Sequence, residues 1–166
     1  MSFYKVLVIG DSGVGKTSLT NKIVFNSFSE KYKATIGCEF GLKILDLNGE
    51  TCRIQLWDLA GQDRLGGISR LYCKDASGAI VVGDITNRDS LQKADLWKNS
   101  VDELLAVNIP MVFCLNKCDK EEAIELSQDD LHRMGQGYAG IFKTSAKEGT
   151  NTDNCLLYTS PSPRDS

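Results

Sequence analysis

The part of the sequence with the clearest chemistry is a glycine-rich octapeptide near the N-terminus, Gly10-Asp11-Ser12-Gly13-Val14-Gly15-Lys16-Thr17. It fits the pattern G-x-x-x-x-G-K-[ST] of a phosphate-binding loop. Glycines let the backbone approach a ligand closely, and successive N–H groups then form a cradle for an anion. The Lys16 ammonium can reach the β- and γ-phosphates of a nucleotide, and the Thr17 hydroxyl can ligate Mg²⁺. We therefore expect the nucleotide to contact Ser12, Gly13, Val14, Gly15, Lys16, Thr17 and Ser18.

The residues on either side of the octapeptide have the pattern that a phosphate-binding loop requires. Residues 4–9 form a short apolar run, which is typical of a buried parallel strand. After Lys16, Leu19 and Ile23 recur at the i, i+4 spacing of a helix. A helix that begins at Lys16 adds its positive dipole end to the site. These flanks disfavour the alternative, a glycine-rich turn that binds nothing.

A second group of candidates follows the apolar run that ends at Trp57, and it reads Asp58-Leu59-Ala60-Gly61-Gln62. The Asp58 carboxylate can hold Mg²⁺ through water, and the Gly61 N–H can point at a γ-phosphate. Gln62 can orient an attacking water. An aspartate at the end of a strand is often only a turn former. The functional interpretation of Asp58 therefore depends on the phosphate-binding loop.

A third group, Asn116-Lys117-Cys118-Asp119, follows another apolar run and indicates which base is bound. Guanine offers two donors, N1–H and the 2-amino group, which the two oxygens of an Asp119 carboxylate can accept. Adenine would leave that carboxylate unpaired, and a site built on a paired hydrogen bond can reject such an analogue by roughly 10⁴–10⁵. The stem of Lys117 can cover the base, and Asn116 can tie loops together. The alternative is a solvated charged loop.

Three weaker candidates can complete the site. The backbone of Ser145-Ala146-Lys147, after the last expected strand, can donate an N–H to guanine O6. Phe28 can stack on the base, although a lone aromatic is more often part of the core. The Thr35 hydroxyl can reach Mg²⁺ from a polar segment, although most loop threonines do nothing of the kind.

The apolar runs predict the elements that position these groups. Runs at 4–9, 78–83 and 111–115 read as central parallel strands, and each is followed by polar or small residues. Ligands of open parallel sheets bind beyond the carboxyl ends of the strands, so the three ends suggest one shared site. Residues 39–47 and 51–57 flank Asn48-Gly49, a hairpin signal, and predict an antiparallel pair at one edge.

Helical spacing and a final short run complete the expected order. An amphipathic helix over about 91–105 follows Thr86-Asn87, which can supply its cap. A short helix near 128–134 and a strand near 141–144 come next. The sequence therefore predicts an α/β doubly wound domain with a mostly parallel six-stranded sheet and one antiparallel edge strand.

Composition narrows the functional class. The 166 residues suit one domain, and a net charge of −3 without a basic cluster disfavours nucleic acid as a partner. The apolar runs are too short to span a membrane, and the N-terminus lacks a long apolar signal region. The six cysteines lack C-x-x-C spacing, so they are more typical of small buried side chains than of metal ligands. Free cysteines of this kind fit a reducing cytosol.

Taken together, these motifs resemble those of the small Ras-like GTPases, and specifically the Rab proteins, over residues 3–154. The resemblance implies a Ras-like G domain of the P-loop NTPase type that binds GTP or GDP with Mg²⁺ and hydrolyses GTP slowly. Gln62, Lys16 and Thr35 would be the catalytic residues, and Thr17, Thr35 and Asp58 the metal ligands. Residues 30–42 and 58–75 would be the two switches, which order around the γ-phosphate.

Further residues resemble Rab proteins in particular. Ile36-Gly37-Cys38-Glu39-Phe40 is similar to the Rab signature I-G-V-D-F. Phe40, Trp57 and Tyr72 would form the aromatic patch that Rab effectors read. Leu59, where threonine is usual, resembles the Rab subgroup of lysosome-related organelles. Leu65 and Cys73 replace a usual phenylalanine and tyrosine of the second switch.

The implied function is a GTP-binding switch that recruits effectors in membrane trafficking. Its implied partners are an exchange factor, a GTPase-activating protein, Rab effectors and a GDP-dissociation inhibitor. The implied location is the cytoplasm and the cytosolic face of endosomal or lysosome-related membranes, reached through a prenylated tail. The alternatives are a nucleotide-bound scaffold without hydrolysis and an ATP-using P-loop phosphotransferase. Asp119 disfavours the phosphotransferase, and Gln62 with Thr35 disfavours the scaffold.

The last residues depart from the Rab pattern. A Rab would continue into a long C-terminal helix, whereas residues 155–165 resemble translated read-through of a sequencing adapter. We therefore expect a G domain over residues 1–154 that lacks its last helix, followed by a non-native tail over 155–166. Pro161 and Pro163 would also break a helix. The alternative is a genuine disordered Ser/Pro tail.

Overall fold

A sheet of seven strands forms the centre of the fold, in the order β2-β3-β4-β1-β5-β6-β7. The computed structural model describes residues 2–11, 13–25, 32–35, 38–47, 49–58, 70–105 and 107–159, and only the backbone of 2, 25, 32–35, 38–40 and 47. The strands are β1 (Ser2–Ile9), β2 (Tyr32–Thr35), β3 (Cys38–Leu47), β4 (Glu50–Asp58), β5 (Gly78–Asp84), β6 (Met111–Asn116) and β7 (Gly140–Lys143). Strands β4, β1, β5, β6 and β7 run parallel, whereas β3 is antiparallel to both of its neighbours.

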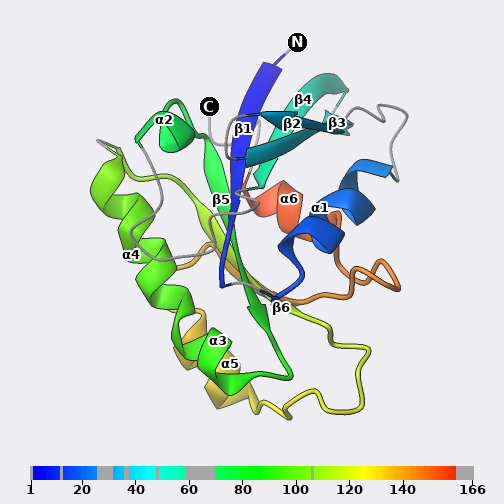
Figure 1. Ribbon diagram of the computed structural model, residues 1–166, viewed down its shortest axis with the longest axis vertical. Coiled ribbons are helices and arrows are strands. Elements are labelled where there is room, and N and C mark those ends of the chain that lie inside the picture. The colour runs from blue at the N-terminus through cyan, green and yellow to red at the C-terminus, as the bar shows by residue number, and fades with distance from the viewer. Residues whose placement is uncertain are drawn as a thin grey trace.

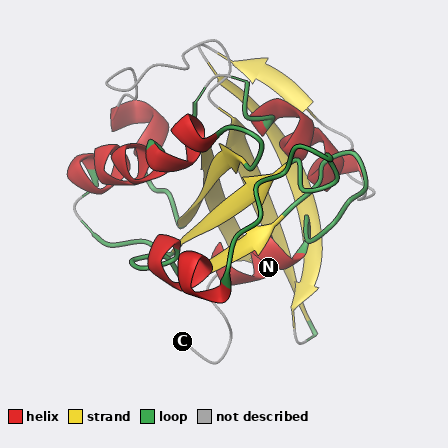
Figure 2. Ribbon diagram, turned by 90° about the horizontal axis from the view of Figure 1, so that it is seen from below, coloured by secondary structure: helices red, strands yellow, loops and turns green. Residues whose placement is uncertain are grey.

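Helices cover both faces of the sheet (Figures 1 and 2). On one face lie α1 (Lys16–Phe25) and α6 (Asn154–Thr159). On the other lie α2 (Arg70–Cys73), α3 (Arg88–Gln92), α4 (Ala94–Leu104) and α5 (Gln128–Met134). Crossovers between parallel strands need such helices, and the two layers make the domain doubly wound.

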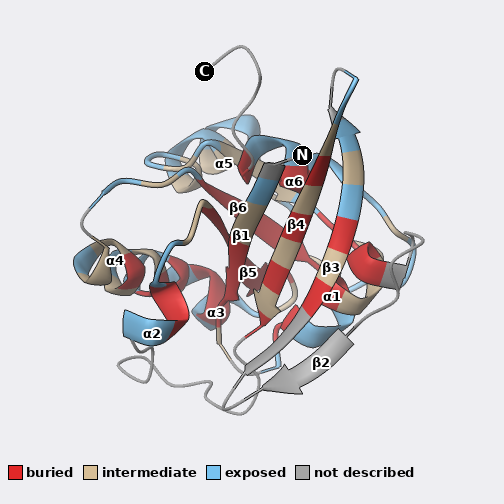
Figure 3. Cartoon of the chain, turned by 90° about the horizontal axis from the view of Figure 1, so that it is seen from above, coloured by how far each residue is buried: buried red, intermediate tan, exposed pale blue. Residues whose placement is uncertain are grey.

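The alternation of side chains along the strands divides the core into two clusters. In β1, Leu7 and Ile9 pack with Trp97 of α4, whereas Val6 and Val8 pack with the helix α1 on the opposite face. Successive residues of a strand point to opposite faces, so every central strand must be apolar on both. Figure 3 shows β5 and β6 buried along their length, as their continuous apolar runs require.

The expected architecture is confirmed, with one strand added. The six expected strands are present, but β2 lies outside β3, so the sheet has seven strands and β3 is not its edge. No strand was predicted over Tyr32–Thr35, because this short segment has only one large apolar side chain, Tyr32, and holds a lysine. Pairing with β3 supplies what the local sequence does not.

The expected helix over 91–105 is in fact two successive helices, α3 and α4, with Lys93 between them. Asn87 caps α3 as expected, because its side-chain oxygen accepts the backbone N–H of Asp89. Ser90 directs its hydroxyl to the carbonyl oxygen of Asn87 at 2.8 Å. Helical bonds continue across Lys93, because its N–H donates to the carbonyl oxygen of Asp89 and its carbonyl oxygen accepts the N–H of Trp97. The break between α3 and α4 is therefore local.

The C-terminal helix α6 spans six residues, far fewer than the long last helix that the resemblance implies. Its Cys155 and Leu156 are fully buried in the cluster that also contains α1. The proposed end of the domain at residue 154 and the origin of residues 155–166 stay predictions. In the part of the chain that the structure describes, no helix has both the length and the apolar character needed to cross a bilayer.

The cysteines that the structure describes in full follow the expected pattern of small buried side chains. Cys52, Cys73, Cys114 and Cys155 are buried, and Cys118 is partly buried. Burial raises the pKa of the Cys73 thiol, which keeps it protonated and unreactive near neutral pH. Among the described residues, no group of three or more His, Cys, Asp or Glu side chains could hold a metal ion.

We predict that Leu156→Ala lowers the free energy of unfolding by about 2–5 kcal/mol, because it removes apolar contacts and leaves a cavity. Leu157 is a matched control, since it lies on the same helix but is 46% exposed, whereas Leu156 is 0% exposed. Leu157→Ala should change stability by only about 0.5 kcal/mol. Urea unfolding of both variants in excess GDP measures the difference. Equal losses would contradict the packing of α6 on the sheet.

Candidate functional site

The candidate site lies where the parallel strands end. Strand pairing places Asp58 beside Val8 near the end of β1, and Asp84 beside Asn116 at the ends of β5 and β6. Carboxylates and an amide therefore meet the phosphate-binding loop at one edge of the sheet. Open α/β sheets bind ligands at this edge, as the sequence predicts.

The backbone of the phosphate-binding loop takes conformations that only glycine allows without strain. Gly13 and Gly15 have φ values of +82° and +94°. A Cβ on Gly15 would lie 2.5 Å from Nδ2 of Asn116, and one on Gly10 would lie 2.3 Å from the carbonyl oxygen of Val82. Side chains at these two positions would therefore push the loop away from the sheet. The glycines keep the loop close to the strand ends.

Lys16 begins α1, and its ammonium lies against the start of the loop. The residue is 7% exposed, and its Nζ donates to the carbonyl oxygens of Gly10 at 2.9 Å and Asp11 at 3.0 Å. The backbone N–H of Leu19 donates to the carbonyl oxygen of Gly15, which begins the helical ladder. The cation is thus held beside the loop N–H groups, where it adds to their attraction for a phosphate.

Thr17 and Asp58 bring two oxygen groups together across the start of α1 and the end of β4. The Thr17 hydroxyl donates to Oδ2 of Asp58 at 2.6 Å, and Asp58 is 0% exposed. A threonine hydroxyl and a carboxylate are donors that magnesium prefers in proteins. The structure thus joins two of the residues that the sequence predicts as metal ligands.

Asn116 links three segments of the candidate site. Its Nδ2 donates to the carbonyl oxygen of Val14 in the phosphate-binding loop at 3.0 Å. Its Oδ1 accepts the hydroxyl of Thr144, just beyond β7, at 3.1 Å. The residue is only 1% exposed, so an amide without these partners would lie buried and unpaired at a high cost.

Lys117 crosses the phosphate-binding loop from the side. Its Nζ donates to the carbonyl oxygen of Gly13 at 2.9 Å and pairs with Oδ2 of Asp84 at 2.9 Å. Burial alone would raise the pKa of Asp84, but hydrogen bonds from Thr86 and Lys117 outweigh it and lower that pKa. Asp84 therefore stays ionised and anchors the lysine across the loop.

Asp119 presents an oriented carboxylate beside Lys117. The Ser145 hydroxyl donates to Oδ1 of Asp119 at 2.8 Å, and this hydrogen bond is the main reason that the pKa of Asp119 is lowered. Ser145 is itself fully buried, and Ala146 and Lys147 follow it in a turn. An ionised carboxylate with a fixed orientation can accept two donors from one ligand.

Several predicted site residues lie outside the described part of the chain. They are Ser12, Phe28, Gly61 and Gln62. For Thr35 and Phe40 only the backbone is described, in β2 and β3 respectively. Much of the two expected switches, 30–42 and 58–75, falls in the same gaps. The roles of these residues stay predictions.

The two described members of the predicted aromatic patch are in contact. The rings of Trp57 and Tyr72 lie 6.4 Å apart in an edge-to-face arrangement. The Tyr72 hydroxyl donates to the carbonyl oxygen of Trp57 and lies 3.2 Å from that of Val8, and Tyr72 is only 4% exposed. Trp57 is partly exposed, so it offers the larger share of any binding surface formed by this pair.

Three residues that support the site through hydrogen bonds were not predicted from the sequence to do so: Asp84, Thr144 and Asp11. Asp84 is noticeable as a polar residue that ends an apolar strand, but its partner Lys117 is 33 positions away in the chain and only the fold reveals the pair. Trp97 reads as one member of an apolar helix face. Only the general need of a buried indole N–H for an acceptor could have suggested its contact with Asp11.

Known proteins similar to this chain carry the same kind of domain. Residues 5–160 match the Ras family. The chain is 44% identical over 162 residues to the Ras-related protein Rab-32 of Mus musculus. The aligned region covers 93% of this chain and 73% of that protein. Rab-32A of Dictyostelium discoideum is 41% identical over 164 residues, covering 93% of this chain and 75% of that protein. Human Rab-7L1 is 38% identical over 159 residues, covering 92% and 78% respectively.

We predict that Gly15→Ala weakens GDP binding by about tenfold or more, because the new Cβ displaces the Asn116 amide. Gly49→Ala is the matched control, since Gly49 has a similar φ of +84° but open space around it. Both variants should lose about 1–2 kcal/mol of stability to backbone strain. Titration with a fluorescent GDP analogue measures the affinities. Equal affinities for the two variants would contradict this account of the loop.

Proposed function

We propose that the site at the strand ends binds GTP and GDP together with Mg²⁺. The chain belongs to the Ras family of GTPases and, within it, to the Rab group. The chain is a GTP-binding switch of membrane trafficking that hydrolyses GTP to GDP. The single observation that supports the proposed site best is the Asn116 amide, which ties the loop next to Asp119 to the phosphate-binding loop. One ligand with a base and phosphates fits such a joined site.

The base specificity follows from Asp119. Its carboxylate is ionised and held by Ser145, so both oxygens are acceptors. Guanine supplies two donors on one edge, N1–H and the 2-amino group. Adenine supplies no donor there, so its binding would remove water from a carboxylate without replacing the hydrogen bonds. Lys117 lies beside this position because Gly13 and Asp84 hold its ammonium, which leaves its aliphatic stem to cover the base.

The phosphates would lie in the loop that follows β1. The loop N–H groups and the start of α1 attract an anion, and Lys16 adds a full positive charge. In this proposal the Lys16 ammonium leaves the carbonyl oxygens of Gly10 and Asp11, or shares its donors with them, to contact β- and γ-phosphate oxygens. The ammonium has three donors, so both arrangements are within its capacity.

The donor set fits a magnesium ion. Thr17 and Asp58 supply a hydroxyl and a carboxylate whose oxygens lie 2.6 Å apart at the start of α1. We propose that Thr17 ligates the ion directly and Asp58 holds it through water, with Thr35 added in the GTP state. When bound, magnesium neutralises charge on the β- and γ-phosphates during transfer.

Hydrolysis requires residues on the second switch. We propose that Gln62 orients the attacking water and that the Gly61 N–H contacts the γ-phosphate, as the family resemblance implies. Unaided turnover is then slow, and a GTPase-activating protein that supplies an arginine accelerates it by roughly 10³–10⁵. The alternative of a scaffold without hydrolysis predicts no phosphate release even with such a partner.

Rab proteins work with regulators and effectors, and the finer assignments are proposals. We propose an exchange factor, a GTPase-activating protein and a GDP-dissociation inhibitor as regulators. We propose that effectors read the patch of Phe40, Trp57 and Tyr72 in the GTP state. The intact protein would reach the cytosolic face of endosomal or lysosome-related membranes through a prenylated tail.

We predict that Asp119→Asn weakens GDP binding by about 10²-fold or more and improves binding of XDP, because the amide offers a donor to the 2-oxo group of xanthine. Asp130→Asn is the control, since Asp130 is another carboxylate with a lowered pKa but lies at the capping box of α5. Competition of GDP, XDP and ADP against a fluorescent GDP analogue measures the change.

The control variant should keep the preference of the unaltered protein for GDP. Equal competition by ADP and GDP in the unaltered protein would contradict the proposed guanine site. An unchanged preference in Asp119→Asn would remove Asp119 from base recognition.

A further inference from the structure

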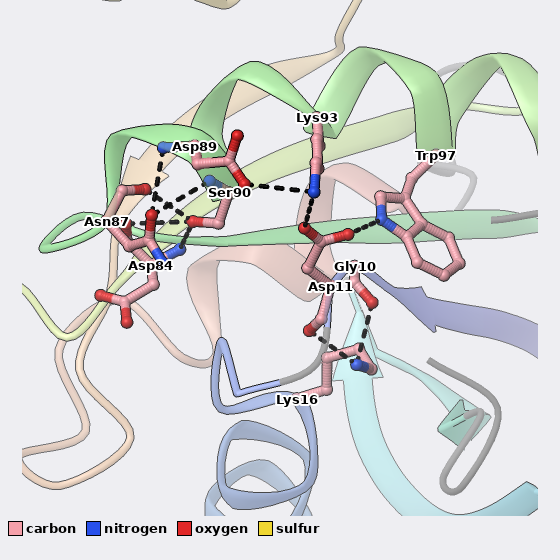
Figure 4. Close-up of polar contacts among 9 residues, drawn as sticks. All are labelled: Gly10, Asp11, Lys16, Asp84, Asn87, Asp89, Ser90, Lys93 and Trp97. Atoms are coloured by element: carbon pink, nitrogen blue, oxygen red, sulfur yellow. Dashed lines mark hydrogen bonds and ion pairs between the residues drawn. The ribbon is translucent and has the colours of Figure 1, made fainter. Parts of the chain in front are cut away.

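The first half of the phosphate-binding loop is attached to the opposite helical layer through one carboxylate. Trp97, on α4, donates its indole Nε1 to Oδ1 of Asp11 at 2.6 Å, and its side chain is 1% exposed (Figure 4). Lys93 approaches the other oxygen, Oδ2, at 3.7 Å. A hydrogen bond between a buried donor and a charged acceptor is among the stronger kinds in proteins.

Asp11 is joined to the proposed phosphate site through its own backbone. Its carbonyl oxygen accepts the Lys16 ammonium at 3.0 Å, next to the carbonyl oxygen of Gly10 at 2.9 Å. The indole, the Asp11 carboxylate, the Asp11 carbonyl and the Lys16 ammonium thus form one continuous set of contacts (Figure 4). A change at Trp97 can therefore reach Lys16 through a single intervening residue.

The helix α3, which directly precedes the helix α4 that carries Trp97, is fixed to the sheet. The Ser90 hydroxyl oxygen accepts the backbone N–H of Asp84 at 2.9 Å and lies 3.2 Å from the carbonyl oxygen of Asp84. Asn87 caps α3 through the backbone N–H groups of Asp89 and Ser90. The indole therefore projects from a helix that follows directly on an element held at the end of β5.

The two halves of the loop are held by different groups. Asn116 and Lys117 bond to the carbonyl oxygens of Val14 and Gly13 in the second half. At Gly13 a Cβ would meet nothing within 4 Å, so that part of the loop has open space on one side. In the first half, the contact with Trp97 and Lys93 holds the side chain of Asp11.

We propose that Asp11 and Trp97 are positioning residues for nucleotide retention: the indole holds Asp11, and Asp11 holds the start of the phosphate-binding loop and Lys16 in the geometry that retains GDP. Neither residue contacts the nucleotide in this account. The inference rests on the proposed nucleotide site. It predicts that loss of the indole–carboxylate bond speeds GDP release even though the guanine contacts stay intact.

The test measures the dissociation rate of a fluorescent GDP analogue in full-length variants at fixed Mg²⁺. Asp11→Ala and Trp97→Phe should each raise the rate roughly threefold to thirtyfold, because each removes the same charge-assisted hydrogen bond. The double variant should be no faster than Asp11→Ala, since the two residues act as one unit. Asp11→Asn keeps an acceptor oxygen for the indole and should restore the rate to within about threefold of the unaltered protein.

A matched control separates positioning from simple stability. Tyr138→Phe removes another aromatic hydrogen bond to α4, from the Tyr138 hydroxyl to Asp95 at 3.0 Å, which does not involve the phosphate-binding loop. It should leave the GDP dissociation rate unchanged, which shows that loss of a hydrogen bond to α4 does not by itself speed GDP release.

The outcomes are distinct for the two proposals. Failure of the unaltered protein to bind GDP would contradict the proposed function. If the unaltered protein binds GDP but Asp11→Ala releases it at the same rate, the positioning role is wrong. Fully additive effects in the double variant would also overturn it, because they would mean that the two residues act separately. If Trp97→Phe fails to fold, the contrast between Asp11→Ala and Asp11→Asn still decides the question.

Discussion

The side-chain amide of Asn116 is the interaction on which the proposed nucleotide site depends. It donates to Val14 and accepts from Thr144 while almost fully buried. Both bonds form only if β1, β6 and β7 end at the same level of the sheet, so the parallel register fixes the site. A buried amide that lost either partner would be strongly disfavoured. The loop that recognises the base and the loop that holds phosphates are therefore parts of one unit, and neither can shift without the other.

The two helical layers stabilise that strand-end edge in different ways. The layer with α1 supplies the helix that starts at Lys16, and its position follows from Leu19 and Ile23 packed on the sheet. The layer with α3 and α4 supplies side chains that reach across to the loop, through Trp97 and Lys93. Each layer depends on strands that are apolar on both faces. The site is thus a consequence of core packing and not an addition to a finished surface.

Local patterns predicted most of the fold and the motifs of the site. The apolar runs and the Asn48-Gly49 signal predicted six of the strands and the antiparallel pair, because both are properties of a few neighbouring residues. Two features were not predicted. They are the edge strand β2, which pairs only with β3, and the local break at Lys93 between α3 and α4. The contacts between Asp84 and Lys117 and between Asp11 and Trp97 were also not predicted. They join residues far apart in the chain, and no spacing rule relates such residues.

The most direct test of this account compares GDP affinity in Asn116→Ala and Asn151→Ala. Asn151 is the control, because its Nδ2 also donates to a backbone carbonyl oxygen, that of Lys143 at 2.8 Å, but in a partly exposed turn. The account predicts that Asn116→Ala weakens GDP binding by about 30-fold or more, since two buried partners lose their hydrogen bonds and the two loops separate. Asn151→Ala should change the affinity by less than about threefold. Equal affinities in the two variants, both within about threefold of the unaltered protein, would contradict the central claim that one amide holds the site together.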